Sequence, residues 1–167
     1  MPAIYQSRWV TGQEMTAVGC NAGEVVQNLF EFPMPAAGLQ IGDIIELGIL
    51  PAHNRFVDAL FVSDKLDGGG TPALAFKIGV MSGVVGVVDA TRTVGQELWL
   101  PFNPGDYSTI LRPSNKEFVV LPAVSYDRSI GLQVTAAAQA AAPAGAMLRV
   151  QTRIAAASNF GGGAGTF

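Results

Sequence analysis

The sequence has few charged side chains for its length. Of its 167 residues only 14% are charged, namely 10 Lys and Arg and 13 Asp and Glu, whereas a soluble domain of this size carries about 42. The net charge of −3 gives no basic surface for the DNA or RNA backbone. The apolar share of 49% excludes the composition of a disordered chain. We therefore expect a folded protein with no nucleic-acid partner.

Long hydrophobic runs are also missing, so a membrane span is not expected. The longest charge-free stretch is Ser129–Leu148, and it contains Gln133, Gln139 and Pro143 in an alanine-rich context. Alanine contributes little to insertion, and glutamine and proline oppose it. Residues 1–8 lack the basic start and apolar run of a signal peptide. The sequence predicts a soluble protein, made in the cytoplasm and without a membrane partner.

Cysteine and histidine are almost absent, which limits the chemistry available. Cys20 is the one cysteine, so no disulfide forms within the chain, and His53 is the one histidine. One of each cannot supply a zinc site without carboxylates. The sequence also lacks GxSxG and GxxxxGK[ST] motifs. The acidic residues Asp64 and Asp67 lack the ligand spacing of a calcium loop, and we expect them to shape a turn. We predict no catalytic residue, no cofactor and no metal site.

Glycine and proline are plentiful, and they divide the chain into short β-rich runs. Eight runs rich in β-branched and aromatic residues are bounded by turn residues, which is typical of an all-β sandwich or barrel. These predicted strands are Glu24–Phe32, Ile44–Leu50, Arg55–Val62, Ala73–Val80, Glu97–Phe102, Glu117–Leu121, Gly131–Thr135 and Ala146–Ile154. The alanine tract 136–144 is interpreted as a connection between the last two strands, with room for a single helical turn.

Both ends of the chain fall outside this pattern. We predict an N-terminal arm at residues 1–20, one β-sandwich domain at 21–157 and a glycine-rich tail at 158–167. The tail is either a frayed terminus or an arm that docks on a neighbouring subunit. Because large aromatic side chains carry most interface energy, the predicted interface residues are Tyr5, Trp9, Phe160 and Phe167.

Two stretches of the chain, Asp43–Ser82 and Tyr126–Arg153, resemble a known family. They contain DIIELGILPA at 43–52, RFVDA at 55–59, VSDKLDG at 62–68 and YDRSIG at 126–131. The order of these segments resembles the capsid cement or head-decoration proteins of tailed bacteriophages. The resemblance implies an all-β, jelly-roll-like antiparallel β-sandwich of about eight strands with extended terminal arms. It also implies a virion protein on the outer surface of the capsid that holds neighbouring major capsid protein subunits together, without catalytic residues.

The low charge supports self-association, because apolar surface is covered when copies assemble. We expect a homodimer or homotrimer that also binds the major capsid protein.

Two other functions stay open at this stage. A carbohydrate- or receptor-binding accessory protein of the virion would use exposed aromatic residues such as Trp99, Phe102 and Tyr107 around Pro101 and Pro104. A hydrolase would place a pair of carboxylates in a cleft.

Overall fold

The computed structural model describes residues 2–21, 24–103 and 109–157, and within these ranges it contains nine strands and one short helix. The elements in chain order are β1 (Ile4–Gln6), β2 (Val25–Pro33), β3 (Ile44–Leu50), β4 (Asn54–Ser63), β5 (Ala75–Met81), β6 (Val94–Phe102), β7 (Thr109–Leu111), α1 (Glu117–Val120), β8 (Arg128–Ala136) and β9 (Met147–Ala156).

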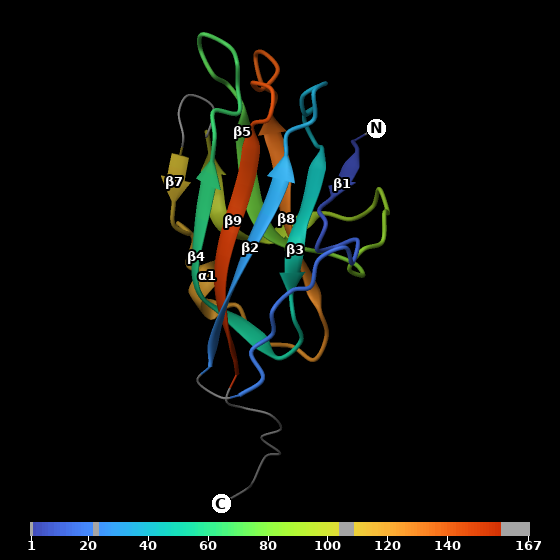
Figure 1. The fold of residues 1–167 in the computed structure, drawn as a ribbon, viewed down its shortest axis with the longest axis vertical. Helices are drawn as coiled ribbons and strands as arrows, with labels where there is room; N and C mark the ends of the chain where they lie inside the picture. The colour runs from blue at the N-terminus through green and yellow to red at the C-terminus, as the bar shows by residue number, and fades with distance from the viewer. Residues whose placement is uncertain (1, 22–23, 104–108, 158–167) are drawn as a thin grey trace, which may run out of the picture.

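The strands form two sheets packed face to face (Figure 1). The five-stranded sheet has the order β1-β3-β8-β5-β6, and the four-stranded sheet has the order β2-β9-β4-β7. Strands β2 and β9, β3 and β8, β4 and β7, and β5 and β6 are antiparallel partners. This nested pairing is that of one long hairpin rolled into a sandwich, which is the jelly-roll arrangement. The predicted jelly-roll β-sandwich is therefore confirmed.

The core lies between the two sheets and follows the alternation of the strands. Along β9, Leu148, Val150 and Ile154 are buried, while Arg149 and Arg153 lie on the other face, as the period of two predicts. The largest fully buried side chains include Trp99, Phe30, Phe61 and Phe76. These rings supply much of the apolar surface that folding removes from water.

The N-terminal segment packs along the β3 edge of the five-stranded sheet. Strand β1 pairs in parallel with β3, outside the eight strands of the roll. Beyond β1, the Trp9 ring meets Phe30 edge-on with 5.5 Å between ring centroids. The side-chain amide of Asn28, on β2, both accepts from Ala17 N and donates to Ala17 O. The boundaries of the predicted arm at 1–20 stay a prediction, but its described residues include a strand and a core side chain.

One predicted strand is wrong. Residues 117–121 were expected to form a strand, and Glu117–Val120 is instead the helix α1. Asn115 Oδ1 accepts from Glu117 N at 3.3 Å, and Phe118 stacks on Phe56 at 5.3 Å between ring centroids. Phe118 also meets the Trp99 ring edge-on at 6.5 Å. Packing of Phe118 against these two rings therefore outweighs the β propensity of the segment.

The strand predictions also missed β1 and β7, which are only three residues long. The alanine tract contains no helical turn in its described residues. Two of its amides are used elsewhere, because Gln139 N and Ala140 N donate to the carboxylate of Asp67.

Asp67 joins the β4–β5 and β8–β9 connections at one end of the sandwich (Figure 1). Its buried carboxylate also accepts from the amides of Gly69, Ala73 and Leu74. Burial raises the pKa of Asp67, but the amide hydrogen bonds outweigh it and hold the pKa well below its usual range. The predicted turn-shaping role of Asp67 is confirmed.

Candidate interaction surface

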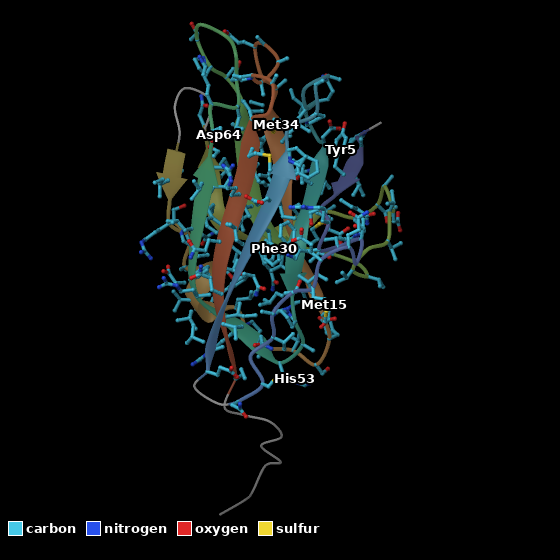
Figure 2. All side chains as sticks on the ribbon, in the orientation of Figure 1. Tyr5, Met15, Phe30, Met34, His53 and Asp64 are labelled. Atoms are coloured by element: carbon cyan, nitrogen blue, oxygen red, sulfur yellow. The ribbon has the colours of Figure 1, made fainter. Side chains whose placement is uncertain are left out.

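The residues singled out from the sequence lie in different environments. Tyr5 is half-buried on β1 and meets the Phe32 ring edge-on at 6.1 Å (Figure 2). Trp9 is 8% exposed and belongs to the core cluster, so its ring mainly stabilises the fold of its own chain. Phe160 and Phe167 lie outside the described residues. The role of all four as interface anchors stays a prediction.

The predictions on metal sites and on His53 can be compared with the described residues. Among the described residues no cluster of three or more His, Cys, Asp or Glu side chains is arranged to hold a metal ion. His53 is half-buried in the turn between β3 and β4. In the part of the chain that the structure describes, no helix has the length and hydropathy that a bilayer span requires.

Trp99, considered above as a carbohydrate platform, is 1% exposed, and its Nε1 donates to Leu111 O. A sugar ring cannot stack on it, so that interpretation of Trp99 is wrong. The side chain of Phe102 and the whole of Tyr107 lie outside the described residues.

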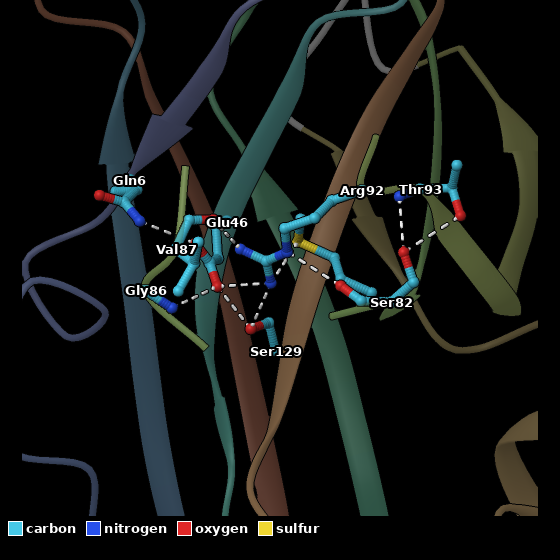
Figure 3. Close-up of polar contacts among 9 residues, drawn as sticks. Gln6, Glu46, Ser82, Gly86, Val87, Arg92, Thr93 and Ser129 are labelled. Atoms are coloured by element: carbon cyan, nitrogen blue, oxygen red, sulfur yellow. Dashed lines mark hydrogen bonds and ion pairs between the residues drawn. The ribbon is translucent and has the colours of Figure 1, made fainter. Parts of the chain in front are cut away.

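The connection between β5 and β6, residues 82–93, lies against the outer face of the five-stranded sheet. Arg92 holds this loop from within (Figure 3). Its Nε donates to Ser82 O at 2.9 Å and its Nη1 to Val87 O at 2.7 Å, so one guanidinium joins both arms of the loop. Its Nη2 donates to Glu46 Oε1 at 2.9 Å and to Ser129 Oγ at 3.0 Å, on the sheet below. The arginine therefore fixes both the shape of the loop and its position.

Glu46 is the fixed partner of this arginine. Its side chain is 0% exposed, and its carboxylate also accepts from Gln6 Nε2 and Gly86 N, each at 3.0 Å. Burial raises the pKa of Glu46, but the hydrogen bonds from Arg92, Ser129, Gln6 and Gly86 outweigh it and hold the pKa below its usual range. The carboxylate is ionised at neutral pH, so a buried ion pair ties loop, sheet and β1 together.

The loop held in this way presents apolar side chains to solvent. Val84 is 70% exposed, Val87 47% and Val88 66%, and Tyr126, from the β8 side, is 63% exposed. Val84, half-buried Val85 and Tyr126 line one open groove. We call Val84, Val85, Val87, Val88 and Tyr126 the valine surface.

Exposed apolar side chains gathered on a fixed loop are typical of a binding site, and a loop ordered in advance loses little entropy when it binds. The arrangement is suited to contact with another protein rather than to catalysis.

Reasoning from the sequence did not identify this surface. The signal available was the segment Val84-Val85-Gly86-Val87-Val88, which has neither strand alternation nor polar turn residues. Gly83 and Gly86 both adopt a positive φ of 78°, a conformation that favours glycine. The pair of Glu46 and Arg92 had no signal in the sequence, because only the topology brings together residues 46 positions apart.

Comparison with known proteins places this fold among phage capsids. No protein-family model and no curated protein sequence matches the chain. A chain in the solved capsid of Ralstonia phage GP4 is 32% identical, with a TM-score of 0.87, over 94% of this chain and 100% of that one. A chain in the capsid asymmetric unit of cyanophage Pam1 is 15% identical, with a TM-score of 0.50, over 84% and 91% of the two chains, and shares the fold. The first match extends over nearly the whole of both chains, and the chain therefore belongs to this family of phage capsid structural proteins.

Proposed function

We propose that this protein is a capsid decoration, or cement, protein. It binds the outer surface of the phage head and stabilises contacts between major capsid protein subunits. The observation that carries the proposal is the 32% identity to a chain of the Ralstonia phage GP4 capsid over 94% of this chain.

The valine surface is the part of the described molecule best suited to meet the capsid. Its members are apolar and largely exposed, and the buried pair of Glu46 and Arg92 fixes their loop. Each copy binds weakly through such a patch, while many copies joined to one another act through effective concentration. We expect the protein to form a homodimer or homotrimer and to be made in the host cytoplasm before it joins the head.

A non-enzymatic role is part of this proposal. It is supported by the family relationship. Carbohydrate binding has no comparable support, since Trp99 is buried.

Co-sedimentation with phage heads that lack this protein tests the proposal. The variant Val84→Asp/Val88→Asp places two carboxylates on the exposed loop and is expected to weaken binding at least about tenfold, or 1.4 kcal/mol. The matched control is Val57→Asp, because Val57 is 50% exposed on β4 of the other sheet. Wild-type protein that does not bind the heads would contradict the decoration role. Equal binding by both variants would contradict the role of the valine surface.

A further inference from the structure

A second apolar groove lies near the end of the sandwich at which β9 terminates. Its apolar lining comes from Trp9, Met15, Val18, Ile49, Pro51 and Ala52. Met15 is 94% exposed and Val18 45%, so the groove is lined by side chains that the chain itself leaves uncovered. Thr16 also lines it, and its buried Oγ1 has no hydrogen-bond partner among the described residues. The groove therefore offers mainly apolar contact.

The last described residues of the chain adjoin both walls of this groove. Ala157 N donates to His53 O at 2.9 Å, in the turn that also contains Pro51 and Ala52. On the other wall, a Cβ added to Gly19 would lie 3.2 Å from Ala156 N, next to Val18. The sequence then continues through residues 158–167. Ten residues extend to at most about 33–36 Å, so this segment is long enough to reach a neighbouring molecule.

The chemistry of residues 158–167, SNFGGGAGTF, complements that of the groove. The segment carries no charged side chain, and its two large side chains are Phe160 and Phe167. Two carboxylates at the margin of the groove already have partners, since Glu14 pairs with Arg8 and Asp127 accepts from Ala52 N. Neither carboxylate is therefore free to bind a basic segment, and the groove suits an uncharged segment with aromatic side chains.

We propose that residues 158–167 of one copy bind the groove of a neighbouring copy, with Phe160 and Phe167 as anchors. Strand β9 carries the chain toward the base of the sandwich, and Met15 lies farther from the base than His53 (Figures 1 and 2). The segment would have to reverse direction to enter its own groove, whereas a neighbouring copy receives it without a reversal. Because the groove and the last described residue, Ala157, lie at the same end of the sandwich, a closed homo-oligomer can pair each groove with the segment of a neighbouring copy. This inference extends the self-association in the proposed function.

Complementation between two defective variants of this protein tests the exchange of residues 158–167 between copies. One variant ends at Ala157, and the other carries Met15→Lys/Val18→Lys, two exposed positions whose substitution leaves the core untouched. In analytical ultracentrifugation we expect the wild type to associate and each variant alone to associate at least about tenfold more weakly. An equimolar mixture should recover association in part, because the intact groove of the first variant receives the segment of the second, whereas the reverse contact is missing. Val57→Lys, on the other sheet, is the control and should associate like the wild type.

Three results would overturn the proposal. They are a wild type that stays monomeric, a shortened variant that associates as well as the wild type, and a mixture that does not recover association. The last result would indicate binding of residues 158–167 within one copy. The experiment contains no phage heads, so its failure leaves the decoration role to be judged by co-sedimentation alone.

Discussion

The outer faces of the two sheets hold their central ion pairs in different environments. On the five-stranded sheet, Glu46 and Arg92 pair with side-chain exposures of 0% and 2%. On the four-stranded sheet, Arg149 pairs with Glu31 and Asp64 at exposures between 28% and 46%. Exposed pairs contribute about 0–1 kcal/mol, whereas breaking a buried pair leaves an uncompensated charge. We therefore attribute the position of the valine surface to the buried pair of Glu46 and Arg92. The ion pairs on the face of the four-stranded sheet are partly exposed to solvent.

The two outer faces also differ in the residues at their centres. Asp58, Arg112 and Arg153 add further ion pairs on the outer face of the four-stranded sheet. The centre of the other outer face contains small or apolar residues such as Ser129 and Gly131, beneath the loop 82–93. The outer face of the five-stranded sheet also carries the partly exposed pair of Lys77 and Glu97. Its difference from the other face therefore lies in the buried pair at its centre and in the apolar loop above that pair.

The largest effect is expected from breaking the buried pair. Arg92→Met leaves the carboxylate of Glu46 buried without its cation and should lower the free energy of unfolding by about 3–5 kcal/mol. Urea denaturation measures this loss. The double variant Arg92→Met/Glu46→Met removes both charges and should be more stable than Arg92→Met alone. If Arg92→Met is no more destabilising than Arg149→Met on the other sheet, the contrast between the faces is wrong.

A second effect tests how closely the loop side of the five-stranded sheet is packed. A Cβ at Gly131 would lie 2.3 Å from the buried Met81 Cγ. We expect Gly131→Ala to lower the free energy of unfolding by about 1–3 kcal/mol. Gly95→Ala is the matched control in the same sheet, because a Cβ at Gly95 meets nothing within 4 Å. Thermal or urea unfolding that shows the same stability for both variants would contradict the close packing.

Acid should act on the buried carboxylates. The pKa values of Glu46 and Asp67 are lowered in the folded protein from 4.5 and 3.8, respectively. The unfolded chain therefore binds more protons at low pH, and stability should fall as the pH drops below about 4.5. Unfolding measured from pH 7 to pH 2 checks this. Asp67→Asn should flatten the lower part of the profile, with Asp64→Asn as the control for charge removal in the same loop. An unchanged profile in Asp67→Asn would contradict the role of its five amide partners.

The smallest effect is expected on the exposed face. Arg149→Gln removes the pairs with Glu31 and Asp64 and should change the free energy of unfolding by less than about 1 kcal/mol. The change should shrink further at high salt, because exposed charges are screened. A loss of more than about 2 kcal/mol in the free energy of unfolding, unchanged by salt, would contradict the weak contribution expected of this face.

The sequence predicted the sandwich well because its strands carry their own signals. Runs such as Ile44–Leu50 coincide with β3, and the alternation along β9 identifies the buried face. What the sequence did not reveal depends on distant partners. Glu46 and Arg92 look like ordinary surface charges until the topology buries them together. For the same reason Trp9, predicted as an interface residue, and Trp99, considered as an exposed aromatic, both belong to the core of this chain.

The central claim is that the loop fixed by Glu46 and Arg92 presents the valine surface to the capsid. Electron cryo-microscopy of phage heads that carry this protein tests it most directly. The account predicts that the protein lies on the outer surface of the head, with Val84, Val88 and Tyr126 in contact with the major capsid protein. A map in which the valine surface faces solvent, while the charged face of the four-stranded sheet meets the capsid, would contradict it.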